Sequence, residues 1–179
     1  MKKIILSIVA VAALVALPMG VKAADGKTTS STNANVTIVD LLTLTKGNEL
    51  NFGTVANGTG GTVTVVAQEA AQLNPDVTGD IAVISTSSAT AASFAVAGTA
   101  SATYAITIPS SVSISSGKLE VGTLTLKTTN TATGSGTAYA SVLDALGKDN
   151  IYIGGILTVS SGAPTGLQTV PFDVTVNYN

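Results

Sequence analysis

The side chains that could do chemistry in this chain of 179 residues are its acids, because the sequence holds no His, no Cys and no Arg. Two turn-rich stretches bring acids close together: Asp76 with Asp80, and Asp144 with Asp149 and Asn150. Oxygens at such spacing could surround Ca²⁺. Asp is also favoured in turns because its side chain bonds nearby backbone. We prefer turn chemistry, and a weak calcium site is the alternative.

The missing residue types exclude most catalytic sites. Without His and Cys there is no thiol nucleophile, no Ser–His pair and no usual zinc site. Without Arg there is no bidentate clamp for phosphate or carboxylate. The glycine pairs Gly60-Gly61 and Gly154-Gly155 lack the following Lys or helix of a phosphate-binding loop. We therefore predict no catalytic residues, no metal, no cofactor and no enzymatic activity.

The first 23 residues are typical of a cleaved signal peptide. Lys2 and Lys3 precede a short apolar run, residues 4–17, and small residues ending at Ala23 suit a signal peptidase. The alternative, a membrane anchor, needs about 20 apolar residues, which this run does not reach. Cleavage after Ala23 leaves five Lys against ten acids. The mature chain thus lacks the basic surface of a nucleic-acid-binding protein.

The fold class follows from apolar alternation and glycine-rich turns. Short strands at fairly regular intervals predict an all-β, antiparallel sandwich. Residues 68–73 could form one helical turn, 57–61 read as a turn, and 138–146 fit a helix or a strand with a loop. The expected strands are 36–45, 62–66, 80–84, 92–97, 103–108, 118–127, 151–160 and 169–178.

The C-terminal segment alternates most strictly. Phe172, Val174, Val176 and Tyr178 share one face, and the residues between them are polar, which predicts a strand with one buried face. Pro171 lacks an N–H, so this strand should lie at a sheet edge. The penultimate Tyr178, together with Gly166 as the fourteenth residue from the end, resembles the C-terminal pattern of chaperone–usher pilins, fimbrial subunits of Gram-negative bacteria.

The first mature strand is irregular. Ala34, Val36 and Ile38 share a face with Leu42 and Leu44, whereas Val39 and Leu41 occupy the other. This shift predicts two strand pieces joined at a bend or bulge near Val39–Asp40. A strand partly detached from its own domain would have this pattern.

The order of the strand motifs strengthens the resemblance. In this order the chain is similar to an uncharacterised bacterial family of secreted fimbrial-like domains. That family is related to the spore-coat-protein-U group, which includes archaic chaperone–usher pilins. The absence of a disulfide, which many pilins have, leaves the pilus class open. The motifs are Leu50–Gly53, Gly61–Val65, Phe94–Gly98, Tyr104–Pro109, Ile153–Val159 and Phe172–Tyr178.

This resemblance implies an immunoglobulin-like sandwich that lacks one strand and receives it from a neighbouring subunit. Residues 24–38 would be the N-terminal extension, with 28–38 as the donor strand. The side chains of Ala34, Val36 and Ile38 would be its plugs, which fill the apolar groove of the neighbouring subunit. Residues 39–179 would form the domain. The implied partners are identical or related pilin subunits, an outer-membrane usher and a periplasmic chaperone. The groove edge that the chaperone would hold is assigned to Gly166, Phe172, Val174, Val176 and Tyr178.

The implied function is a structural pilin exported through the periplasm to a fimbrium on the cell surface, where it could meet a host or abiotic surface. The alternative is a self-complete secreted sandwich that serves as an adhesin, a glycan-binding module or a surface-matrix protein. A glycan-binding module would need exposed aromatic side chains, and only Tyr104, Tyr139 and Tyr152 are candidates.

Overall fold

The structure is a computed structural model that describes residues 28–72, 74–84, 89–114 and 117–179. The predicted signal peptide lies outside these residues. The chain divides into two compact units, Met1–Thr37 and Ile38–Asn179. In the first unit, residues 28–37 form no strand or helix and are all exposed. The described residues contain no helix long and apolar enough to cross a membrane.

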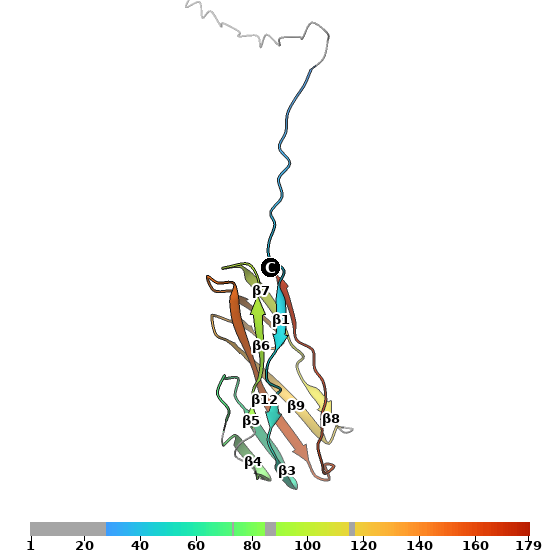
Figure 1. Cartoon of the computed structure of the whole chain (residues 1–179). Helices are drawn as coiled ribbons and strands as arrows, with labels where there is room; N and C mark the ends of the chain where they lie inside the picture. Colours follow the sequence, from blue (N-terminus) through green and yellow to red (C-terminus); the bar gives the residue numbers. More distant parts are fainter. Residues whose placement is uncertain (1–27, 73, 85–88, 115–116) are drawn as a thin grey trace, which may run out of the picture. The chain divides into compact units, whose positions relative to one another are not determined.

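The second unit is an all-β fold, and every strand pair in it is antiparallel (Figure 1). The described residues contain no helix, which confirms the predicted all-β sandwich-like class. The strands are β1 (Thr43–Lys46), β2 (Asn51–Phe52), β3 (Val55–Val65), β4 (Asp76–Val83), β5 (Ala89–Thr90), β6 (Ala92–Ala97), β7 (Thr103–Thr107), β8 (Val112–Ile114), β9 (Leu119–Thr128), β10 (Thr133–Ser135), β11 (Ala138–Val142), β12 (Lys148–Ser160) and β13 (Thr175–Tyr178).

The long strand β12 organises the larger sheet. Its first half pairs with β6 and its second half with β3, while β9 pairs along its opposite edge. The strands β1, β4 and β8 extend this sheet outward from β6, β3 and β9. A smaller sheet has the order β10-β11-β7-β13, and β2 pairs with β5.

The core lies between the inward faces of these sheets. Tyr104 and Ile106 of β7 are fully buried, as are Ile151 and Ile153 of β12. Each pair is two residues apart, so both side chains of a pair point to the same side of their strand. The alternation in the sequence thus becomes one apolar cluster shared by the two sheets.

Both terminal strands are shorter than predicted, because their partner strands end. The register of β1 on β6 places Thr43 opposite Ala97, and the chain then turns away at Gly98. Residues 36–42 therefore have no strand to pair with. The register of β13 on β7 places Thr175 opposite Thr107, and continuing it would set Asp173 opposite Pro109. Pro has no N–H to donate, so pairing begins at Thr175.

Other predictions were corrected in the middle of the chain. Residues 68–72 form no helix, and residues 57–61 are not a turn but lie inside β3, where its register on β4 shifts between Asn57 and Gly60. The ambiguous stretch 138–146 becomes β11 followed by a turn. Strands β2, β5, β8 and β10 were not predicted, since two or three residues are too few to show a period.

Candidate strand-docking seam

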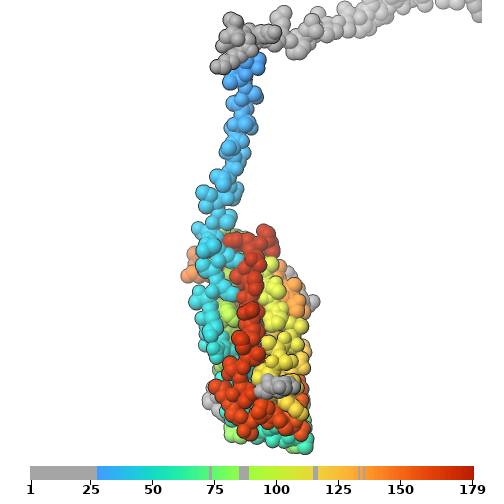
Figure 2. All heavy atoms as spheres, turned by 90° about the vertical axis from the view of Figure 1, so that its right-hand side faces the viewer, coloured from blue at the N-terminus to red at the C-terminus, as the bar shows by residue number. Residues whose placement is uncertain are grey.

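Two strand edges without a strand partner define the candidate site. In the described residues β1 pairs only with β6, and β13 pairs only with β7. The cyan β1 segment and the red C-terminal segment run side by side in both views of the molecule (Figures 1 and 2). We call these two facing edges the seam. An unpaired edge presents backbone N–H and C=O groups that another strand can bind.

Apolar side chains line the seam from both segments. Leu42 and Leu44 lie on the β1 side, and both are half-buried against the core. On the other side the structure brings four predicted groove-edge residues onto one face, also half-buried and packed on the core: Phe172, Val174, Val176 and Tyr178. The residues between those four are exposed. The fifth predicted residue, Gly166, is exposed and has a positive φ of 94°, so it turns the chain before this segment.

The Tyr178 hydroxyl closes one end of the seam. It donates to the Asp40 carbonyl at 2.9 Å and accepts from the Thr99 amide at 2.8 Å. The Asp40 amide in turn donates to Thr99 Oγ1 at 2.8 Å. A Cβ at Gly98 would contact the Tyr178 hydroxyl, so Gly makes room for it. These bonds, which sequence reasoning missed, fix the backbone of Asp40 beside the last strand.

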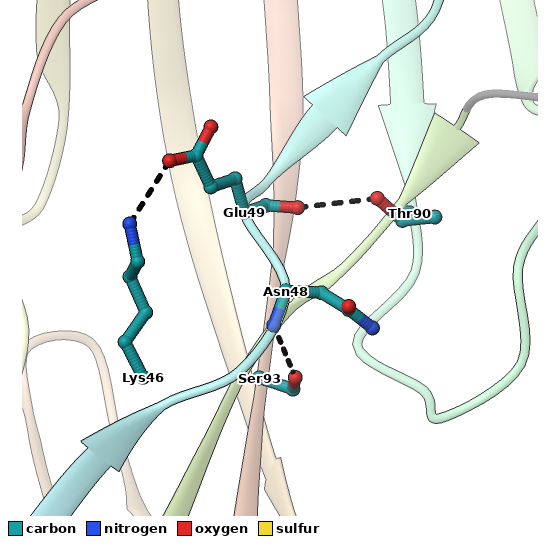
Figure 3. A network of polar contacts seen from close by, with 5 residues as sticks. All are labelled: Lys46, Asn48, Glu49, Thr90 and Ser93. Atoms are coloured by element: carbon teal, nitrogen blue, oxygen red, sulfur yellow. Dashed lines mark hydrogen bonds and ion pairs between the residues drawn. The ribbon is translucent and has the colours of Figure 1, made fainter.

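The link from β1 to β2 is held from the other side (Figure 3). The Asn48 amide donates to Ser93 Oγ at 2.8 Å, and Thr90 Oγ1 donates to the Glu49 carbonyl at 3.1 Å. Lys46 and Glu49 form an exposed ion pair at 2.9 Å. These contacts attach the segment after β1 to β5 and β6 and involve none of the backbone groups on the seam side of β1.

The predicted donor residues are exposed apolar side chains. The exposed fractions are 82% for Val36 and 88% for Ile38, and Ala34 is also exposed. They alternate with the polar residues Asn35 and Thr37. We call residues 28–38 the arm. Its alternation is that of a strand with one apolar face, although the structure gives it no strand partner among the described residues.

The acids singled out in the sequence do not gather around a common point. Asp80 Oδ2 accepts from the amide and the hydroxyl of Thr59, and Asp144 Oδ1 accepts from the amides of Leu146 and Lys148. No group of three His, Cys, Asp or Glu residues in the described part of the chain could hold a metal ion. These two acids serve turns and a bulge, as turn chemistry predicts.

Asp149 is different, because it is a buried carboxylate with only 3% of its surface exposed. Its Oδ2 accepts from the Tyr104 hydroxyl at 2.9 Å and from the Ser141 hydroxyl at 2.7 Å. Its Oδ1 accepts from the amides of Asn130 and Asn150. Four donors therefore surround the charge, and both oxygens are occupied. This arrangement suits a structural anion and leaves no free lone pair for substrate chemistry.

Tyr104 cannot contribute to a sugar-binding surface. Its ring is fully buried. Burial, and then the hydrogen bond to Asp149, raise the pKa of Tyr104 well above its usual value. Tyr152 is nearly buried and Tyr139 half-buried. The three candidate aromatics therefore form no exposed stacking platform.

The described residues form an antiparallel all-β domain in which the unpaired edges of β1 and β13 face each other along the seam. The chain belongs to the family described as Domain of unknown function (DUF4402), whose model matches residues 42–178. This match begins at Leu42 and ends at Tyr178, so it includes both edges of the seam and excludes the arm. No curated protein and no solved structure matches the chain.

Proposed function

We propose that this chain is a fimbrial-like structural subunit that polymerises by donor-strand exchange at the bacterial cell surface. The arm of one copy inserts into the seam of the next and supplies the strand that both edges lack. The observation that carries this proposal is that the same chain contains two unpaired, apolar-lined strand edges and an exposed segment with the alternation of a strand. The proposal includes no catalytic role and no cofactor.

The chemistry of the two surfaces is complementary. The seam offers backbone groups along β1 and β13 together with half-buried aliphatic and aromatic side chains. The arm offers Ala34, Val36 and Ile38 on one face, with Asn35 and Thr37 facing water. A strand added to a sheet edge gains affinity from backbone hydrogen bonds and specificity from alternate side chains.

The expected energy is sufficient to hold a polymer without a disulfide, which the chain cannot form. Burying an aliphatic side chain contributes about 1.5–3 kcal/mol, and each backbone hydrogen bond adds about 1 kcal/mol net. Two large plugs and several such bonds give on the order of 10 kcal/mol, comparable to the stability of a whole domain.

A subunit with an unpaired apolar edge needs protection before assembly, because such edges aggregate. The proposal therefore includes a periplasmic chaperone that binds the segment Phe172–Tyr178 and an outer-membrane usher that receives the subunit. It also includes export by a cleaved signal peptide. Identical or related subunits are the partners in the assembled fimbrium, which could meet a host or abiotic surface.

Deleting residues 24–38 tests the proposal. The variant should fold, because residues 28–38 contribute no strand to the sheets, but it should form no SDS-resistant oligomers. The matched control deletes residues 24–27 and keeps the arm. If the 24–38 deletion still forms SDS-resistant ladders, the arm is not the donor. If the full mature chain never forms ladders and resists proteases as a monomer, the self-complete secreted sandwich is the better description.

A further inference from the structure

Among the exposed large aliphatic side chains outside the arm and the strands, three belong to the two chain segments that form the seam. The exposed fractions are 93% for Leu167, 83% for Leu41 and 55% for Val39. Each exposed aliphatic side chain of this kind costs free energy in water and is favourable to cover. Neither Leu41 nor Val39 shares the even-numbered face of the arm, so the proposed strand insertion does not cover them.

Leu41 and Leu167 lie at opposite ends of the seam. Leu41 follows Asp40, whose carbonyl is bound to the Tyr178 hydroxyl. Leu167 lies eleven residues before Tyr178, at the other end of the extended C-terminal segment. Figure 1 shows this segment running from a red loop at one end of the domain to the C-terminus beside β1 at the other.

The loop that presents Leu167 is held in place. Lys118 Nζ donates to the Ser161 carbonyl at 3.3 Å, and Asn57 Nδ2 donates to the Ala163 carbonyl at 3.4 Å. The Ala163 amide donates to the Ser160 carbonyl at 3.1 Å. These bonds anchor residues 160–163, which precede the exposed Leu167 by a few residues at the end of the seam distant from Tyr178.

An inserted arm can be antiparallel to only one edge of the seam, because β1 begins beside the end of β13, where Asp40 is bonded to Tyr178. We take the C-terminal segment as its antiparallel partner. All ten described strand pairs are antiparallel. An arm that pairs in the same sense with the C-terminal segment starts near Tyr178 of the receiving copy and ends near its residue 168. The eleven residues of the arm span about 36 Å when extended, nearly the length of residues 167–178. The residues just after the arm then arrive beside Leu167.

We infer that Leu167 of the receiving copy binds Val39 and Leu41 of the donating copy, as a second contact that the strand exchange does not include. The partner is another copy of this chain, because only the arm of such a copy delivers these two side chains to that end of the seam. The inference rests on the proposed function. It assigns Val39 and Leu41, the odd-numbered apolar residues between the arm and β1, to the junction between subunits.

Engineered cysteines test this contact cleanly, because the chain has none of its own. Single variants Leu41→Cys and Leu167→Cys are refolded together and treated with a short bismaleimide. Mixing single variants rules out cross-links within one chain. We expect covalent dimers from this mixture. A second mixture, Leu41→Cys with Leu146→Cys, is the matched control, since Leu146 is also strongly exposed but lies in the turn bonded to Gly98, at the Tyr178 end.

The outcomes separate this contact from the strand exchange. SDS-resistant oligomers with covalent dimers only in the Leu41/Leu167 mixture support both. SDS-resistant oligomers without those dimers overturn the contact and leave the strand exchange standing. Dimers in the Leu41/Leu146 mixture alone mean that the arm enters from the opposite end, which overturns the contact. If no arm-dependent oligomers form, both proposals fail.

Discussion

The Tyr104 hydroxyl donates a hydrogen bond of 2.9 Å to Asp149, and this bond joins the two sheets through the core. Tyr104 belongs to β7 of the smaller sheet and Asp149 to β12 of the larger one. Ser141 of β11 adds a second bond of the same kind, and its hydroxyl lies 3.1 Å from that of Thr128 on β9. A domain without disulfides thus has a polar tie between its layers, in which the buried charge accepts from donors on both sides.

Replacing Asp149 with Asn tests how much this tie contributes. Asn keeps the shape but turns one acceptor into a donor, which then faces N–H or O–H groups that have lost their partner. We expect a loss of about 2–4 kcal/mol in the free energy of unfolding, measured by urea denaturation. Asp76→Asn is the control, because Asp76 is exposed on β4 and should change stability by less than about 0.5 kcal/mol. Equal stabilities for the two variants would show that the tie is dispensable.

Alkaline pH should weaken the same region. Burial and the Asp149 hydrogen bond raise the pKa of Tyr104 in the folded state, so the unfolded state releases this proton first. The contribution of Tyr104 to the free energy of unfolding is complete below the unfolded pKa of ~10. It falls by about 1.4 kcal/mol per pH unit above that value. Urea titrations between pH ~9 and ~11 should show this slope, and the Tyr104→Phe variant should have a shallower one. Parallel slopes would contradict the assignment.

The sequence was sufficient for the fold class and for some of the interior strands. The strand 92–97 was predicted with its observed bounds, because alternation and flanking turns agree there. The ends of the terminal strands could not be predicted, since they depend on where β6 and β7 stop at Gly98 and before Pro109. Those partners are far away in the chain, and a local period carries no information about them.

The buried role of Asp149 was missed, although a signal existed. Asp149 shares odd-numbered parity with Ile151 and Ile153, both fully buried, so extending that strand backward places the carboxylate inside. The neighbouring Asn150 and Gly147 favoured a turn instead. For the seam, alternation from Phe172 to Tyr178 correctly indicated the half-buried face. The hydroxyl contacts of Tyr178 join residues 79 and 138 positions apart, which no single sequence reveals.

The Tyr178 hydroxyl should stabilise the start of the domain. Tyr178→Phe removes its bonds to the Asp40 carbonyl and the Thr99 amide, with an expected loss of about 1–2 kcal/mol. Hydrogen exchange at the Thr99 amide should also become faster. The control is Tyr139→Phe, because Tyr139 is half-buried like Tyr178 but its hydroxyl has no hydrogen-bond partner among the described residues. If both variants lose the same stability, the bonds to Asp40 and Thr99 contribute little.

Lysine substitutions in the arm should distinguish the face that enters the seam from the face that points away from it. Lysine at Val36 or Ile38 would have to enter the apolar seam of another copy, where an unpaired charge is costly, so SDS-resistant oligomers should disappear. Lysine at Thr37 would point away from the seam under the same alternation and should leave oligomers intact. All three positions are exposed in the single chain, so the stability of the monomer should change by less than about 0.5 kcal/mol in every variant. Gel electrophoresis without boiling, together with thermal unfolding of the monomer, measures both effects. Oligomers that tolerate Val36→Lys and Ile38→Lys as well as Thr37→Lys would show that these side chains are not plugs, because a buried strand face cannot accept charge equally on both sides.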